Sequence, residues 1–209
     1  MSYFPFFIDI GGERALVAGG GRVALRKVSA LLEFGALVKV VATKLCQPLR
    51  ELSGNCSGQL ELCEREFADD DVKNVLFVIA ATDDAKLNHH ISMLCRERGI
   101  LVNAVDQKED CSFFFPAYVK RGEVVAGITS GGNSPMLAGR IRSRLEEQIP
   151  EYYGELNDQL GGIRERVKAE IATEEGRRRY MEEVLERMQE RQGLLEEQEI
   201  EELFRKYRR

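Results

Sequence analysis

The fold of this 209-residue chain is decided by the stretch Ala15-Leu16-Val17-Ala18-Gly19-Gly20-Gly21-Arg22-Val23-Ala24. Its first four residues are apolar, as in a short buried strand, and they lead into three consecutive glycines. Over residues 23–34 the apolar side chains recur at the spacing of one helix face, and Gly35 is placed to end that helix. The stretch therefore predicts a strand, a glycine loop and a helix, in that order.

The glycine loop has the spacing Gly19-x-Gly21-x-x-Ala24, which matches the fingerprint of dinucleotide-binding loops. The first glycine permits a tight turn, Gly21 lets the backbone approach a diphosphate, and Ala24 keeps the helix close to the strand. Free N–H groups at the start of the helix would face the anion. We therefore predict that NAD binds here, through Gly19, Gly20, Gly21, Arg22 and Val23.

The sequence departs from this fingerprint at the end of the second apolar run. An NAD site of this type normally has an acidic residue there, which binds the ribose hydroxyls. Here the run ends Val41-Ala42-Thr43-Lys44. Thr43 could form a hydrogen bond with a ribose hydroxyl, whereas Lys44 would favour the 2′-phosphate of NADP. We predict that both residues contact the cofactor, and the spacing alone leaves NAD and NADP open.

Short apolar runs alternate with helix-length segments along the first half of the chain. After residues 37–41, further runs predict strands at residues 60–63, 76–81 and 100–105. Strands that alternate with helices imply crossover connections, a parallel sheet and helices on both of its faces. We therefore predict an α/β fold with a Rossmann-like nucleotide domain over residues 1–112.

The pattern changes after residue 106. Residues 112–118 and 124–129 are β-rich, and the basic segment between them predicts a hairpin turn. Ser134 or Asn133 is placed to cap a helix that begins at Pro135 and ends near residue 148. These features predict a small α+β segment over residues 113–149.

Residues 150–209 are rich in charged helix-forming residues and contain no β-rich run. They predict a small helical C-terminal domain. From about Met188 the sequence is so polar that we expect fraying or disorder.

Composition limits the classes of partner. The formal net charge is −5, so the molecule as a whole does not attract nucleic acid, and we expect none as a partner. We see no signal peptide and no run of the roughly 20 apolar residues that a membrane span needs, so we expect a cytoplasmic protein without membrane contact.

The five cysteines include no Cys-x-x-Cys pair, and neither a disulfide framework nor a zinc site is predicted. His89 and His90 are adjacent on a predicted helix and point about 100° apart, so we expect no shared metal ion.

Several motifs occur in order along the chain and extend beyond the glycine loop. They are Gly19-Gly-Gly-Arg-Val-Ala-Leu-Arg-Lys27, Ala80-Ala-Thr-Asp-Asp84, Val102-Asn-Ala-Val-Asp106, Phe115-Pro-Ala117 and Thr129-Ser-Gly-Gly-Asn-Ser-Pro-Met-Leu-Ala138. Together they resemble the siroheme synthase amino-terminal family, the precorrin-2 dehydrogenases of which several are also sirohydrochlorin ferrochelatases. The resemblance covers about residues 4–145, with a looser likeness in the helical tail.

The resemblance implies NAD-dependent oxidation of the tetrapyrrole precorrin-2 to sirohydrochlorin. In the bifunctional members Fe²⁺ is then inserted, and the sequence leaves open whether this chain does so. The resemblance also implies a homodimer, built through the α+β segment that follows the nucleotide domain. Two other hypotheses remain: a chelatase without dehydrogenase activity, against which the intact glycine loop argues, and a non-catalytic module that binds nucleotide and tetrapyrrole.

Asp106 is the predicted catalytic residue. It follows the fifth predicted strand, where ligands of open α/β sheets bind, and the resemblance places the family's key aspartate at this position. A carboxylate there could accept a proton as hydride leaves for the nicotinamide, or remove pyrrole protons as a metal enters. The family pattern also places Thr82 and Asp83 beside the cofactor.

The loop before Pro135 is predicted to bind the carboxylates of the substrate. Hydroxyl groups in a flexible loop at the start of a helix suit an anion, and a polycarboxylate also needs paired cations. Ser130 could in addition be phosphorylated. The predicted substrate-binding residues are Ser130, Gly131, Gly132, Asn133, Ser134, Arg121 and Arg140.

Overall fold

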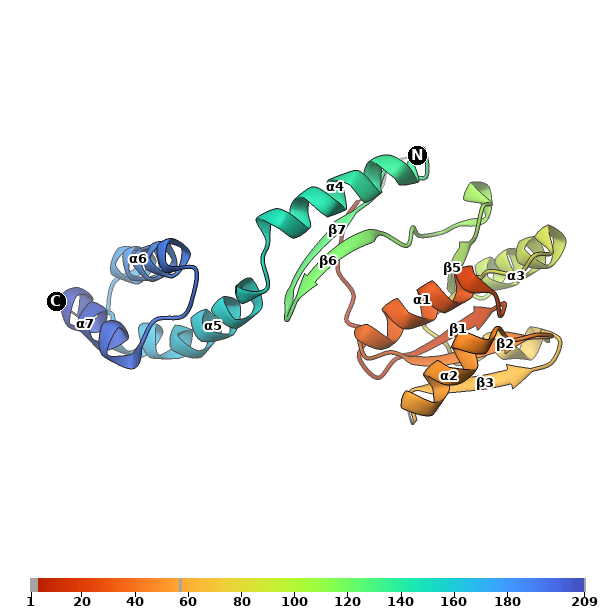
Figure 1. Ribbon diagram of the computed structural model, residues 1–209, viewed down its shortest axis with the longest axis horizontal. Helices are drawn as coiled ribbons and strands as arrows, with labels where there is room; N and C mark the ends of the chain where they lie inside the picture. Colours follow the sequence, from red (N-terminus) through yellow and green to blue (C-terminus); the bar gives the residue numbers. More distant parts are fainter. Residues whose placement is uncertain (1–3, 57, 209) are drawn as a thin grey trace. The chain divides into compact units, whose positions relative to one another are not determined.

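The computed structural model describes residues 4–56 and 58–208 (Figure 1). The chain forms two compact units, Met1–Phe115 and Pro116–Arg209. The first is an α/β domain, and the second combines a β-hairpin with helices. In the described part of the chain, no helix is both long enough and apolar enough to span a membrane.

The first unit is built on a five-stranded sheet, whose strands are β1 (Arg14–Ala18), β2 (Leu37–Ala42), β3 (Leu60–Glu64), β4 (Phe77–Ala80) and β5 (Leu101–Ala104). Their order is β3-β2-β1-β4-β5, and all neighbours are parallel. The chain runs outward from β1 to β3 and then crosses to β4 on the other side of β1. The carboxyl ends of β1, β2, β4 and β5 consequently share one edge, with the change of direction at β1. The predicted α/β, Rossmann-like fold is confirmed.

Helices cover both faces of this sheet (Figure 1). Helices α1 (Arg22–Glu33) and α2 (Gln47–Asn55) pack on the face to which Val17 points, and α3 (Ala85–Glu97) packs on the face to which Leu16 points. Alternate residues of a strand face opposite sides, so a strand between two helical layers has to be apolar throughout. This is why residues 15–18 form an unbroken apolar run.

Three short elements complete the unit. Helix α2 was not predicted from the sequence, because its one buried residue, Leu49, leaves no apolar periodicity to detect. The connection from β3 to β4 contains the 3₁₀ turn η1 (Asp69–Val72), and β5 is followed by the 3₁₀ turn η2 (Lys108–Asp110).

The second unit begins with the hairpin of β6 (Ala117–Arg121) and β7 (Val124–Ile128), against which α4 (Pro135–Gln148) packs. The prediction that the first strand begins at residue 112 is wrong. Residues 112–115 instead follow the free edge of β5, where the Ser112 N–H donates to Val102 O (2.8 Å) and Asn103 Nδ2 donates to Phe113 O (3.0 Å). The predicted basic turn is also too long, because only residues 122 and 123 lie between the strands.

The rest of the second unit is helical, with α5 (Tyr152–Glu170), α6 (Glu174–Arg191) and α7 (Glu197–Tyr207). The expectation of fraying or disorder from Met188 onward is wrong. Helix α7 buries Phe204, whose ring centroid lies 4.5 Å from that of Tyr180, and Met188 is itself fully buried. Ion pairs join α7 to α5, among them Arg166–Glu201, so the charged residues of this tail form contacts between helices.

Candidate dinucleotide-binding site

The glycine loop is closely packed between the loops that follow β2 and β4. Gly19 has φ +125°, and a Cβ built on it would lie 2.2 Å from Ala81 O; a Cβ on Gly20 would lie 2.2 Å from Lys44 O. The Gly19 N–H donates to Val41 O (2.9 Å), and Gly20 O accepts a hydrogen bond from the Cys46 N–H (2.8 Å). Side chains are therefore excluded at both positions by neighbouring backbone.

Gly21 is exposed, and a Cβ built on it would meet nothing within 4 Å. It is the N-cap of α1, and the Leu25 N–H makes the first bond of the helix to Gly21 O (3.0 Å). Over this described segment no side chain caps α1, so the N–H groups of Arg22, Val23 and Ala24 are left without helical partners. Together with the positive end of the helix dipole and the cationic Arg22, this arrangement fits a diphosphate.

The two loops beside the glycine loop carry the other predicted cofactor residues. Thr43 and Lys44 follow β2 and are exposed. Thr82 and Asp83 follow β4, on the opposite side of β1. The parallel sheet therefore brings both pairs of residues to the same edge as the glycine loop.

The Thr82 side chain holds its own loop. Its Oγ1 donates to Asn88 Oδ1 (2.7 Å), and Asn88 Nδ2 donates back to Thr82 O (3.0 Å). Asp84, in turn, caps α3 by accepting from the N–H groups of Lys86 and Leu87. Asn88 was not identified from the sequence, although it is a buried polar residue on the first turn of a helix. Of the predicted pair, Asp83 is the residue whose side chain is exposed.

Asp106 is exposed at the carboxyl end of β5 with φ +60°, a left-handed conformation that Asp adopts more readily than most residues. The turn around it is fixed from both sides. Gln107 Nε2 donates to Ala85 O (3.0 Å), and the Cys111 thiol lies 3.2 Å from Ala104 O and 3.4 Å from Gln107 O. The predicted catalytic carboxylate is thus held at the edge of the sheet where the carboxyl ends of the strands lie.

Lys27, on α1, ends the first of the motifs that carry the family resemblance, but it was not predicted as a site residue. Its Nζ lies 3.9 Å from the centroid of the Phe115 ring, and the side chain is half-buried. Burial lowers the pKa of Lys27 to about 8, Arg26 acts in the same direction, and Cys111 opposes the shift. The available signal was a lysine between Ala24 and Val28, on the border of the apolar face.

The predicted substrate loop of the second unit is bonded to itself. The Gly131 N–H donates to Thr129 Oγ1 (3.1 Å), and the Ser134 N–H donates to Ser130 Oγ (3.0 Å). Gly131 and Gly132 have φ +63° and +78°, and the Asn133 N–H donates to Ser130 O (3.2 Å). Of the two predicted caps, Ser134 is the one that caps α4, because its Oγ accepts from the N–H of the residue at position 137.

Arg121 and Arg140 have different surroundings. Arg121 Nε donates to Ile149 O (3.0 Å) and Nη1 to Lys120 O (2.9 Å), and Glu151 lies 3.3 Å away. These contacts tie the hairpin to the segment after α4. Arg140 is exposed on α4. Of the two predicted cations, Arg140 therefore retains the freer side chain.

The adjacent histidines bind different carboxylates. His89 Nδ1 lies 2.9 Å from Asp110 and His90 Nε2 lies 2.7 Å from Asp69. Residues 4–56 and 58–208 contain no cluster of three or more His, Cys, Asp or Glu that could hold a metal ion.

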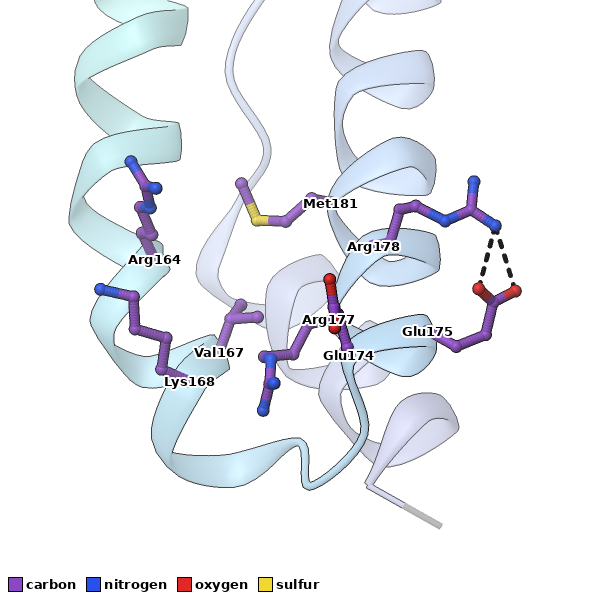
Figure 2. Close-up of a pocket in the computed structure, with 8 residues that line it drawn as sticks. All are labelled: Arg164, Val167, Lys168, Glu174, Glu175, Arg177, Arg178 and Met181. Carbon is purple, nitrogen blue, oxygen red and sulfur yellow. Dashed lines mark hydrogen bonds and ion pairs between the residues drawn. The ribbon is translucent and has the colours of Figure 1, made fainter.

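A separate cavity of about 630 Å³ lies between α5 and α6 (Figure 2). Val167 and Met181 are its apolar lining residues, and Arg178, which also lines it, pairs with Glu175. Its remaining lining residues are Arg164, Lys168, Glu174 and Arg177. None of the predicted site residues lines this cavity.

Comparison with known proteins agrees with this geometry. Residues 6–117 match a family model described as "Putative NAD(P)-binding". The siroheme synthase of Thioalkalivibrio sulfidiphilus is 46% identical over 186 residues, which is 89% of this chain and 38% of that protein. The siroheme synthase of Nitrosospira multiformis is 43% identical over 188 residues, or 89% of this chain and 40% of that protein. This chain thus spans about two fifths of the length of these relatives.

Among solved structures, one described as "SirC, precorrin-2 dehydrogenase" is 26% identical, with a TM-score of 0.75. The match covers 98% of this chain and 100% of the other. The resemblance stated from the sequence motifs is therefore confirmed. The family match covers more than half of the chain and includes the glycine loop, so this protein belongs to the NAD(P)-binding family that it defines.

Proposed function

We propose that this protein oxidises precorrin-2 to sirohydrochlorin with NAD as the hydride acceptor. The observation that carries the proposal is the uncapped start of α1, enclosed by the loops after β2 and β4 on the same sheet edge as Asp106. The match to a precorrin-2 dehydrogenase along nearly the whole chain supplies the substrate, and the siroheme synthase relatives supply the pathway. In this proposal the diphosphate binds Gly19–Val23, and Thr43, Lys44, Thr82 and Asp83 flank it.

Asp106 is proposed to accept the proton that the reaction releases. The substrate loses two hydrogens: one leaves as hydride to reduce NAD⁺ to NADH, and the other leaves as a proton. A positioned carboxylate at the strand end is suited to receive that proton. The left-handed backbone at Asp106 supports the assignment, because strained conformations are kept where the surrounding structure enforces them.

The second unit is proposed to bind substrate carboxylates through the loop of residues 130–134, with Arg140 as the cation and with Arg121 fixing the hairpin. It is also proposed to form a homodimer. Met136 and Leu137 on α4 are 73% and 53% exposed, and Ile141 is exposed beside them. A second copy of the chain would remove these side chains from water.

The proposal is tested by incubating the purified protein anaerobically with precorrin-2 and NAD and recording the absorbance spectrum. Formation of sirohydrochlorin together with one equivalent of NADH is expected. Folded protein that binds both ligands without forming NADH would contradict the proposal and support a non-catalytic module. Insertion of Fe²⁺ is proposed as a second activity on the family resemblance, and a separate incubation of sirohydrochlorin with Fe²⁺ and without NAD tests it.

The Asp106→Asn variant tests the role of the carboxylate. Asn tolerates the left-handed backbone as well as Asp does, so the turn should be preserved. Loss of a general base typically costs about 10²–10⁴-fold in rate, and NAD affinity should stay unchanged. Asp70→Asn, at an exposed position in η1, is the matched control. Turnover by Asp106→Asn equal to that of the control would exclude Asp106 as the base.

A further inference from the structure

Lys27 has an unusual environment for a lysine in the first unit. Its stem lies along α1 beside the buried face of the helix, and its Nζ rests 3.9 Å from the centre of the Phe115 ring. The interaction with the ring partly offsets the cost of removing the ammonium from water. Within residues 4–56 and 58–208, Lys27 forms no ion pair and donates no side-chain hydrogen bond. The ammonium therefore keeps its three N–H donors for another acceptor.

The position of Lys27 relates it to the turn that carries Asp106. Phe115, whose ring Lys27 contacts, lies four residues after Cys111 in the segment that leads away from this turn. The thiol of Cys111 in turn contacts Ala104 O and Gln107 O, the carbonyl groups on either side of Asp106 in the chain. Lys27 thus lies beside the segment that follows the Asp106 turn, on the face of the sheet that α1 covers.

An anion of the ligand would complete this environment. The cofactor diphosphate already has the N–H groups of Arg22, Val23 and Ala24 at the start of α1. Lys27 lies five residues after Arg22 on the helix, which is about 7.5 Å at the rise of an α-helix. Its Nζ lies against the Phe115 ring, in the segment that returns along β5 from the Asp106 turn. The anion suited to this position is therefore one carried by the molecule that reacts at Asp106.

We propose that Lys27 binds a carboxylate of the tetrapyrrole substrate and so positions the macrocycle beside Asp106. This inference rests on the proposed function, because it takes the substrate from there. It adds a substrate-binding residue in the first unit, whereas the other candidates for carboxylate binding lie in the second. Lys27 is a positioning residue in this scheme, and the proton acceptor is still Asp106.

The pH dependence of binding follows from the surroundings of Lys27. Burial lowers the pKa of the free lysine to about 8, so the ammonium is largely charged at pH 7 and loses its proton above pH 8. The ionisable groups that act on it are Arg26, whose positive charge also lowers the pKa of Lys27, and Cys111, whose own pKa is raised, chiefly by burial. Carboxylates of the ligand are ionised throughout. Affinity for a polycarboxylate should therefore fall as the pH rises through about 8.

The test uses the full chain and sirohydrochlorin as the probe, with binding followed by the change in its absorbance at pH 7 and pH 9.5. Lys27→Met should bind sirohydrochlorin at least tenfold more weakly than wild type at pH 7 and should lose the pH dependence. Lys27→Arg should bind at both pH values, because the guanidinium keeps its charge. Lys73→Met is the matched control, since Lys73 is an exposed lysine of the same unit that pairs with Asp70. Binding of NAD, measured by calorimetry, should be equal in all four proteins.

The outcomes separate this inference from the proposed function. Wild-type protein that binds NAD but not sirohydrochlorin contradicts the proposed function, and this inference with it. If wild type binds sirohydrochlorin and Lys27→Met binds it equally well, the proposed function stands and the role of Lys27 is excluded. A parallel loss of NAD affinity in Lys27→Met would instead place the ammonium on the cofactor diphosphate and overturn the assignment to a substrate carboxylate.

Discussion

Replacing either of two glycines of the loop by alanine should affect a different property: the stability at Gly19, and the affinity for NAD at Gly21. Gly19→Ala places a Cβ 2.2 Å from Ala81 O, whereas real Cβ atoms stay at least 3.0 Å away, so the backbone would have to move by about 0.8 Å. The backbone at Gly19 also has φ +125°, which an alanine rarely adopts. In Gly21→Ala the new Cβ meets nothing within 4 Å, and its φ of −87° suits any residue.

These geometries set the expected magnitudes. A forced overlap costs about 1–3 kcal/mol and a strained backbone a similar amount, so Gly19→Ala should lose roughly 4 kcal/mol of the free energy of unfolding. For a unit of this size that corresponds to a fall in Tm of about 15 °C. Gly21→Ala should change the stability by no more than about 1 kcal/mol. Its methyl group would nevertheless occupy space where the diphosphate is expected, so NAD affinity should fall at least tenfold, or about 1.4 kcal/mol.

Thermal unfolding followed by circular dichroism measures the first effect, and calorimetric titration with NAD measures the second. Both variants are studied in the full chain, so that each serves as the control for the other. Gly19→Ala with the Tm of wild type would refute the steric argument. Gly21→Ala that binds NAD as tightly as wild type would show that the diphosphate does not lie against the start of α1.

Three further predictions concern single side chains. The side chain of Asp71 is 4% exposed and accepts hydrogen bonds from Arg65, the Ala68 N–H and Lys39, which hold its pKa well below the usual range. Asp71→Asn should therefore lose about 2 kcal/mol of the free energy of unfolding, measured in urea at pH 7. Because the pKa of Asp71 is lower in the folded protein than in the unfolded chain, this contribution to stability is complete above the unfolded pKa of about 3.9 and is lost as the pH falls toward the folded pKa. An Asp71→Asn variant as stable as wild type at pH 7 would rule out the contribution. The buried hydroxyl of Tyr180 finds no hydrogen-bond partner in the described chain, so Tyr180→Phe should gain about 1 kcal/mol in the same unfolding assay, and a loss would show that the hydroxyl is satisfied. Lys44→Asp supplies the acidic residue that the end of β2 lacks and should shift the ratio of NAD to NADP affinity at least tenfold toward NAD, by calorimetry; an unchanged ratio would place Lys44 away from the ribose.

The parts of the fold that were predicted correctly are those specified by neighbouring residues. The apolar run at residues 15–18, the glycines after it and the 3.6-residue spacing of Ala24, Val28 and Leu31 all lie within one stretch, and each specifies its own conformation. The structure of the C-terminal stretch that contains α7 was predicted wrongly for the opposite reason. Its buried Ile200, Leu203 and Phe204 lie among charged residues. Lys206 pairs with Glu183 and Arg208 with Glu170, so the partners of these charges lie on other helices.

The same distinction applies to the candidate site. Gly19, Gly21 and Asp106 could be predicted as site residues because a motif or a strand end marks each of them locally. Asn88 could not, because its role is to hold Thr82, six residues earlier in the chain, and only the folded loop brings the two side chains together. Lys27 is the extreme case, since the Phe115 ring that defines its environment comes from the last residue of the first unit.

This explains why residues 112–115 were assigned to the wrong element. Taken alone, the run of aromatic residues at positions 113–115 is typical of a strand. In the folded unit the same segment is anchored to β5 by Ser112 and Asn103, and the rings of Phe113 and Phe115 pack against the face of the sheet that α1 covers. The segment therefore packs beside Lys27, and its apolar side chains pack within the first unit and not with the hairpin. The environment of Lys27 is created by this segment and exists only in the folded chain. For this reason the decisive test of the role proposed for Lys27 is its response to ligand and pH.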